Sequence, residues 1–226
     1  MSRILNIVQK LTNRFLLLIR NRSFFDLVQF VAILAVSFFR GLIKGYPLVF
    51  FGRHVTIRCR KKLKIGKFSR IEDFVEIDAF GSAGITIGRE TKIGRYSILR
   101  VPGVPFEIGA GISIGDRTTL AEFCFVGGAG LVSIGEDNSI GQYVSIHPQN
   151  HANSTKSSST ISKGITIGSN NWIGAKATIL DGITLGDGNI FGAGTVVTKS
   201  FGCGKTVLGN PGKVILQSTS NPKVRS

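Results

Sequence analysis

Aliphatic residues recur at intervals of six along most of this chain, and a short phrase marks where each group begins. The phrase is aliphatic-x-aliphatic-Gly, and its copies are Leu63–Gly66, Ile85–Gly88, Ile112–Gly115, Val132–Gly135, Ile165–Gly168 and Ile183–Gly186. The longest unbroken run of the hexad is Ile167, Ile173, Ile179, Leu185, Phe191 and Val197. This period suits neither a helix nor a plain alternating strand, but it suits a short strand followed by a corner.

Three such sides make one coil of 18 residues. Stacked coils would pair their strands in parallel at about 4.8 Å, with the aliphatic of each hexad pointing inward. A glycine directly after the aliphatic fits a corner, where a Cβ would obstruct the turn or require a positive φ. Since no coil has a core of its own, stability comes from the stack. The pattern therefore predicts an all-β parallel β-helix.

Insertions interrupt the coils at one place only. Successive phrases are 22, 27, 20, 33 and 18 residues apart, which exceeds one coil by 4, 9, 2, 15 and 0 residues. The hexads stay in register inside each unit, so every insertion follows the third hexad. All the loops should then leave the prism at one edge, which in repeat architectures is commonly the binding face.

The first fifty residues follow a different pattern. Apolar residues from Ile4 to Leu18 recur at helical spacing, and Arg3, Lys10 and Arg14 group together beside them, which predicts a basic amphipathic helix. A second apolar stretch, Leu27–Phe39, is short for a bilayer span and lacks a cleavage site typical of a signal peptide. We expect residues 1–50 to attach to a membrane surface; helices packed on the domain or on a neighbouring subunit, and a true span, are the alternatives.

The composition narrows the choice of partners. A formal net charge of +15 indicates attraction to an anionic partner, and 29 glycines fit repeated tight turns. Cys59, Cys124 and Cys203 follow no disulfide or zinc-ligand spacing. We therefore expect no metal site and a reduced, cytosol-facing compartment.

From about residue 63 to residue 215 the chain resembles the hexapeptide-repeat acyltransferase family. The most specific segments are 165–174, 191–199 and the closing Gly209-Asn-Pro-Gly-Lys213-Val-Ile, which look like the sugar and polysaccharide O-acetyltransferase branch. The resemblance implies a left-handed β-helix, whereas general crossover chirality would favour the right-handed form. It divides the chain into the helical segment 1–50, an acyltransferase domain 51–216 and a flexible tail 217–226.

The longest insertion carries the candidate base. Acetyl transfer from a thioester to a hydroxyl needs a group that removes the hydroxyl proton, and imidazole suits that role near neutral pH. His147 and His151 both lie here, and the resemblance selects His151, leaving His147 to face solvent. Glu122 and Asn150 are the candidate partners that fix the tautomer of His151. Glu122 is alternatively a bare surface carboxylate.

The resemblance also implies a site for acetyl-CoA, used as a co-substrate. Backbone contacts are expected from Gly174, Ala175, Ala193 and Gly194, with Trp172 bordering the acceptor or pantetheine slot. Nearer the nucleotide end, the resemblance implies Thr198, Lys199 and Lys213. Trp172 is alternatively an outward aromatic that an adjacent subunit covers.

These residues predict an acetyl-CoA-dependent O-acetyltransferase acting on a sugar of a lipopolysaccharide, capsule or exopolysaccharide precursor. The alternatives are a serine or other small-molecule O-acetyltransferase and a non-enzymatic basic β-helix that binds membranes or polyanions. A γ-class carbonic anhydrase would need three zinc-binding histidines, and His54 precedes the coils.

The expected partners follow from the same residues. We expect a homotrimer that covers Trp172 and the outward Phe123 and Phe125. A lipid-linked or free sugar acceptor and an anionic membrane surface complete the partners, and no nucleic acid is expected. The protein should lie in the cytoplasm, attached peripherally to the inner face of a bacterial cell membrane.

Overall fold

The computed structural model describes residues 24–104, 107–151 and 160–215. The predicted basic helix near the N-terminus and the predicted tail 217–226 lie outside these residues. The second apolar stretch forms helix α2 (Phe24–Ile43), as the pattern predicts, and the helix is longer than the stretch itself. The segment Phe25–Ile43 is long and apolar enough, by length and composition only, to cross a membrane.

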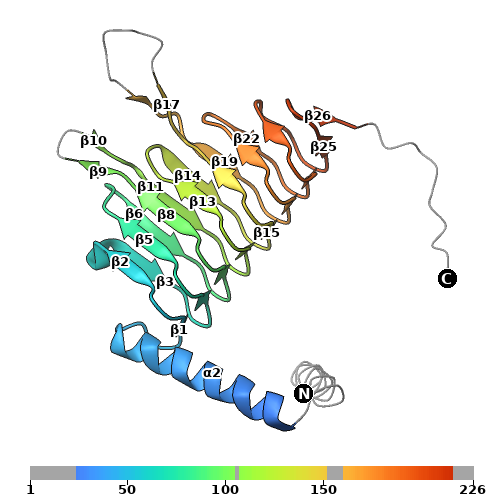
Figure 1. Cartoon of the computed structure of the whole chain (residues 1–226). Helices are drawn as coiled ribbons and strands as arrows, with labels where there is room; N and C mark the ends of the chain where they lie inside the picture. Colours follow the sequence, from blue (N-terminus) through green and yellow to red (C-terminus); the bar gives the residue numbers. More distant parts are fainter. Residues whose placement is uncertain (1–23, 105–106, 152–159, 216–226) are drawn as a thin grey trace, which may run out of the picture.

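Helix α2 ends just before a glycine in the left-handed conformation. Gly45 adopts the left-handed conformation at φ 70°, and the Tyr46 N–H donates to the Gly41 carbonyl at 2.9 Å, which is a common helix C-terminus. Gly41 packs directly on the Val49 carbonyl, and the Phe38 ring lies 6.2 Å from that of Phe50. These contacts hold the C-terminal end of α2 against the first coil, below which the helix lies in Figure 1.

The hexads form three parallel sheets that stack along one axis (Figure 1). Sheet A contains β1 (Phe50–Phe51), β4 (Arg70–Ile71), β7 (Lys92–Ile93), β12 (Thr119–Leu120), β15 (Ser139–Ile140), β20 (Trp172–Ile173), β23 (Ile190–Phe191), β25 (Thr206–Leu208) and β26 (Lys213–Val214). Sheet B contains β2 (Thr56–Arg58), β5 (Glu76–Ala79), β8 (Ile98–Val101), β13 (Phe125–Gly127), β16 (Ser145–Ile146), β21 (Thr178–Ile179) and β24 (Val196–Val197). Sheet C contains β3 (Leu63–Ile65), β6 (Gly84–Ile87), β11 (Gly111–Ile114), β14 (Leu131–Ile134), β19 (Ile165–Ile167) and β22 (Thr184–Leu185). Of these strands, β26 alone in the described ranges runs antiparallel to its neighbour.

Each coil runs through sheets C, A and B in turn, so the prism has a C–A corner, an A–B corner and a B–C edge. A short 3₁₀ turn, η1 (Arg60–Lys62), makes the first B–C connection. The hexad aliphatics point inward and stack in register, as Ile93 does between Ile71 and Leu120 in sheet A. All three of these side chains are fully buried. The predicted inward position of the hexad aliphatics is confirmed.

The glycine that ends each aliphatic-x-aliphatic-Gly phrase allows neighbouring coils to approach closely. A Cβ on Gly88 would lie 2.5 Å from the Gly115 carbonyl carbon, so no larger residue fits. The positive φ falls two residues later, on non-glycine residues such as Glu90 and Arg117, and on Gly188 after the last phrase. Either cause was expected at the glycine; the structure places the close approach there and the positive φ two residues later.

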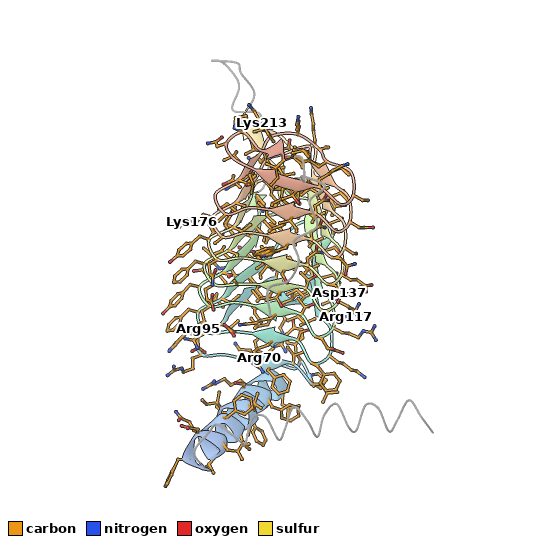
Figure 2. The ribbon with its side chains drawn as sticks, turned by 90° about the vertical axis from the view of Figure 1, so that its right-hand side faces the viewer. Arg70, Arg95, Arg117, Asp137, Lys176 and Lys213 are labelled. Carbon is orange, nitrogen blue, oxygen red and sulfur yellow. The ribbon has the colours of Figure 1, made fainter. Side chains whose placement is uncertain are left out.

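The C–A corner is polar inside and charged outside. Its buried side chains are Ser69, Thr91, Thr118, Asn138, Asn171 and Asn189. Each bonds backbone groups of an adjacent coil, as Thr118 does when its hydroxyl donates to the Gly135 carbonyl at 2.8 Å. On the outside Arg117 contacts Asp137 at 2.8 Å, a pair labelled in Figure 2. The inner bonds fix the stacking because buried polar groups are costly when unpaired.

The A–B corner carries a ladder of aromatic rings. His54, Phe74, Tyr96, Phe123 and Tyr143 stack in that order, with successive ring centroids 4.9, 4.9, 5.0 and 4.9 Å apart. All five residues have a positive φ between 53° and 60°. The spacing equals the distance between coils, so each ring covers the face of the next.

Candidate functional site

Two hairpins project from the B–C edge, as the insertion pattern predicts. The first pairs β9 (Gly103–Val104) with β10 (Glu107–Ile108), and the second pairs β17 (Asn150–His151) with β18 (Thr160–Ile161). Both leave the same side of the prism in Figure 1. Each forms because the chain leaves a sheet B strand, runs through a long insertion and comes back to begin the sheet C strand of the next coil.

Asp181 holds the root of the second hairpin. Its carboxylate accepts the N–H groups of Lys163 and Gly164, each at 2.9 Å, and the side-chain amide of Asn150 at 3.4 Å. The two ends of the insertion are therefore tied to the next coil by one charged acceptor. Hydrogen bonds to an ionised acceptor are stronger than neutral ones, so this contact orients the hairpin.

A cavity of about 340 Å³ lies between the roots of the two hairpins. Arg100 of β8 and Pro102 line it just before the first hairpin, and His147, Pro148 and Gln149 line it just before the second. The Arg100 guanidinium also contacts Glu76 at 3.3 Å. The wall combines a cation, an imidazole, an amide and an aromatic ring from Phe125, which suits a small polar ligand with an apolar face.

His147 is part of this cavity wall and stacks on Phe125 with ring centroids 5.2 Å apart. Burial lowers the pKa of the His147 imidazole, so its neutral form is favoured. His147 was expected to face solvent, and its side chain is exposed while it also lines the cavity, so the structure adds a role in the cavity wall without contradicting that expectation. The contact with Phe125 could not be expected from the chain order alone.

The structure places the backbone of His151 in β17, opposite Thr160 of β18, and its side chain is outside the described set. Asn150 precedes it with its amide turned to Asp181. The assignments of His151 as base and Asn150 as its partner stay predictions.

Glu122 lies at a different corner from the two histidines. It belongs to the A–B turn between β12 and β13, where its carbonyl accepts the Tyr143 N–H at 3.1 Å. The insertion with His151 leaves the B–C edge instead. A single chain does not bring Glu122 to the hairpin, so the predicted contact would have to form between subunits.

The residues predicted to contact acetyl-CoA divide between two parts of the prism. Trp172 stands on the outer face of sheet A with 59% of its surface exposed. Gly174 and Ala175 form the adjacent A–B turn, and Ala193 and Gly194 occupy the same turn one coil later. The Gly194 N–H donates to the Ala175 carbonyl at 2.8 Å, which keeps the two turns in contact.

Thr198 and Lys199 lie instead on the B–C edge, the edge that bears the hairpins. Lys199 places its ammonium 5.7 Å from the Phe201 ring. Lys213 lies in β26 at the end of sheet A, where it is labelled in Figure 2. A single prism therefore does not gather all eight residues around one groove.

Two residues of this region were not selected from sequence. Arg100 directly precedes the nine-residue insertion, and Asp181 ends a coil that carries no insertion. The position beside an insertion was a usable signal for Arg100, whereas Asp181 reaches the hairpin only because the next coil stacks next to it. In the described ranges no cluster of three potential metal ligands occurs, and His54 is stacked on Phe74 at the A–B corner.

Comparison with known proteins agrees with the repeat and the fold. Residues 164–199 match the family model of the bacterial transferase hexapeptide (six repeats). A hexapeptide-repeat acetyltransferase from Vibrio cholerae, crystallised with acetyl coenzyme A, is 22% identical, with a TM-score of 0.50 over 60% of this chain and 71% of that one. A point mutant of AntD, an N-acyltransferase from Bacillus cereus, is 19% identical, with a TM-score of 0.50 over 74% of this chain and 80% of that one. The crystal of this AntD mutant contains dTDP-4-amino-4,6-dideoxyglucose and coenzyme A.

The matched segment runs from β19 to β24, so it passes twice through sheets C, A and B, and the same repeat continues through the remaining coils. The fold is shared along most of the length of both solved structures. The chain thus has the left-handed parallel β-helix fold of the hexapeptide-repeat acyltransferases, and its residues 164–199 match the hexapeptide family model.

Proposed function

We propose that this protein is an acetyl-CoA-dependent O-acetyltransferase that modifies a sugar hydroxyl of a lipopolysaccharide, capsule or exopolysaccharide precursor. The observation that carries the proposal is the cavity between the two hairpin roots. It lies next to the strand that bears His151 and is lined by His147, Arg100 and Phe125. Sugars present hydroxyl groups around an apolar ring face, and this wall offers partners for both.

The proposed reaction is a direct transfer. His151 takes the proton from the sugar hydroxyl as its oxygen attacks the thioester carbonyl, and a tetrahedral intermediate forms. When the C–S bond breaks, the same imidazole returns the proton to the departing thiolate. The products are the acetyl ester and free coenzyme A, and no enzyme nucleophile is required. Asp181 fixes the hairpin root, which would limit the motion of the base.

The solved structures support the choice of substrates. The Vibrio cholerae acetyltransferase of the same fold holds acetyl coenzyme A, and AntD holds an amino sugar nucleotide with coenzyme A. We extend the acyl donor and a sugar-type acceptor to this chain. Because AntD is an N-acyltransferase, an amino sugar is an acceptor to be tested beside the hydroxyl acceptors.

The attachment and assembly belong to the same proposal. Helix α2 exposes apolar side chains along its length, among them Phe25, Val31 and Phe39. We propose that it seats the protein peripherally on the cytoplasmic face of the membrane, beside lipid-linked acceptors. We also propose a homotrimer, in which the exposed Trp172 and the aromatic ladder meet the neighbouring prism. A fully active monomer by light scattering in mild detergent would contradict the trimer.

The test is acetyl transfer by the purified protein to a panel of nucleotide sugars, lipid-linked oligosaccharides, amino sugars and serine. His151→Ala and His151→Asn should each lower kcat by roughly 10²–10⁴-fold, because neither side chain accepts a proton at neutral pH. His147→Gln should mainly raise the acceptor KM, by roughly 10-fold, since it changes the cavity wall.

Three outcomes would contradict parts of the proposal. Full activity of His151→Ala with inactive His147→Gln would move the base to His147. Transfer to serine alone, or to amines alone, would replace the acceptor class. Turnover absent with every acceptor, in a folded protein that binds acidic vesicles, would favour a non-enzymatic membrane-binding β-helix.

A further inference from the structure

A second cavity, distinct from the one at the hairpins, lies between helix α2 and the first coils of sheet A. It has a volume of about 520 Å³, and we refer to it as the α2 cleft. Its helix wall is apolar and includes Phe30, Ile33 and Leu34. Its other wall comes from β1, β4 and the adjoining A–B turns. Pockets for single small molecules are typically about 300–1,000 Å³, so the cleft has room for one ligand.

The cleft is basic on the side of the β-helix. Four arginines line it, and their positions are 40, 53, 70 and 95. Two carboxylates oppose them: Asp73 contacts Arg53 at 3.4 Å, and Glu72 contacts Lys92 at 3.0 Å and Arg95 at 4.0 Å. The lining therefore has two more arginines than carboxylates.

The excess charge belongs to two particular side chains. In the described ranges, Arg40 and Arg70 form no ion pair with any carboxylate. Arg40 comes from the last turn of α2, and Arg70 starts β4, so they approach the cleft from its two walls. Figure 2 shows Arg70 directly above the helix and Arg95 beside it. Guanidinium groups bind phosphate oxygens through paired N–H donors, so this arrangement suits a phosphate.

We infer that the α2 cleft binds one anionic glycerophospholipid, with the phosphate between Arg40 and Arg70 and an acyl chain along Phe30, Ile33 and Leu34. A soluble anion would use the arginines but not the apolar wall. The lipid uses both, and the exposed apolar side of α2 adjoins the same cleft. The inference rests on the proposed membrane attachment and is independent of the proposed chemistry.

Such a site makes the membrane attachment selective. Apolar side chains on the outer side of α2 would insert into any bilayer, whereas the cleft requires a negatively charged headgroup. The bound lipid would also bridge the helix to β4, since Arg40 and Arg70 lie on different elements. The orientation of the β-helix on the membrane would then depend on the lipid composition.

The test compares lipid retention by the full chain in a nonionic detergent, measured by native mass spectrometry with added phosphatidylglycerol or phosphatidylcholine. The Arg40→Gln/Arg70→Gln variant should lower the affinity for phosphatidylglycerol by roughly 10- to 30-fold. The matched control is Lys64→Gln/Lys67→Gln, which removes the same charge from exposed positions outside the cleft. The control should change the affinity by no more than about twofold.

Several results would overturn the inference. These are equal losses in the two variants, equal affinity for phosphatidylcholine, or arginine-dependent binding of inorganic phosphate with the same affinity as the lipid. Lipid binding that appears only after removal of residues 1–23 would make the cleft a seat for the chain's own N-terminal segment. Flotation with neutral vesicles separates the lipid site from the membrane attachment. If the wild-type protein does not float with these vesicles, the attachment itself is contradicted. Acetyl transfer measured in detergent reports on the chemistry alone.

Discussion

Asn138 joins neighbouring coils inside the C–A corner, and its truncation gives a sharp test of how the stack is held. The side-chain amide donates to the Gly168 carbonyl at 2.8 Å, and its oxygen accepts the Asn171 N–H at 2.8 Å. Asn138→Ala leaves both backbone groups without these partners, and the Asn171 N–H is buried. An unsatisfied buried group costs about 1–3 kcal/mol, and the less buried carbonyl costs less, so the free energy of unfolding should fall by roughly 2–4 kcal/mol.

The preceding coil supplies the control at the same corner. Thr118 occupies the equivalent position one coil earlier, where its hydroxyl donates to the Gly135 carbonyl at 2.8 Å and accepts the Asn138 N–H at 3.2 Å. Asn138→Thr should therefore keep one donor and one acceptor in place and cost less than about 1 kcal/mol.

Thermal unfolding followed by far-ultraviolet circular dichroism measures both variants. For a chain of this length, Asn138→Ala should lower the Tm by roughly 5–15 °C and Asn138→Thr by only a few degrees. If Asn138→Ala unfolds at the wild-type temperature, the inner hydrogen bonds do not hold the coils together. If Asn138→Thr is as unstable as Asn138→Ala, the effect comes from packing and the hydrogen-bond argument is wrong.

Further predictions concern the hairpin, the cavity and the thiols. Asp181→Ala should lower kcat by roughly 10-fold or more and change the Tm by no more than a few degrees, because the hairpin root loses its carboxylate acceptor. Turnover at the wild-type rate would show that Asp181 does not position the base. Burial lowers the pKa of His147, so the unfolded chain takes up the proton first and the free energy of unfolding should fall as the pH decreases below 6.5. Urea unfolding should show a smaller loss in His147→Gln. The same pH profile in the variant and the wild type would contradict this prediction. Burial raises the pKa of the Cys124 thiol to about 11, so iodoacetamide should label the exposed Cys203 in the native protein and Cys124 only after unfolding. Equal labelling of Cys124 and Cys203 in the native protein would refute this prediction.

The β-helix could be predicted because one physical constraint repeats. Each hexad must place one aliphatic inside the prism, so the spacing of Ile167, Ile173 and Ile179 determines the register of three sheets at once. The position of the insertions followed from the same spacing. The handedness did not, because the hexad pattern is the same for both hands and the resemblance alone indicated it.

The turns were less predictable. Tyr96 and Phe123 adopt positive φ values of 58° and 60°, which a rule based on glycine does not anticipate. A non-glycine residue in the left-handed conformation costs roughly 1–2 kcal/mol, and an aromatic contact stabilises the fold by about 0.5–1.5 kcal/mol. The contact exists only because the neighbouring coil brings another ring 5.0 Å away, which depends on the completed stack.

The candidate site shows the same limit. His147 and Phe125 are far apart in the chain, yet stacking of β13 and β16 brings them together at the cavity. Glu122 was selected from its position in a hexad, and the structure places that hexad at a corner away from the insertion. Residue types and spacing indicated the chemistry, while the geometry of one prism decides which residues can meet.

The confinement of every long insertion to the B–C edge has a consequence for how such a chain can diversify. A loop can lengthen or shorten there without shifting any strand, because the following sheet C strand re-enters at the same register: β11 and β19 both align with β14 despite preceding loops of different length. Recognition can therefore change while the scaffold is inherited intact. The short turn at residues 128–130 lies between the two hairpin coils, and its Gly128 and Ala129 line the cavity, so a longer loop there would reshape the candidate site and leave the strands in register.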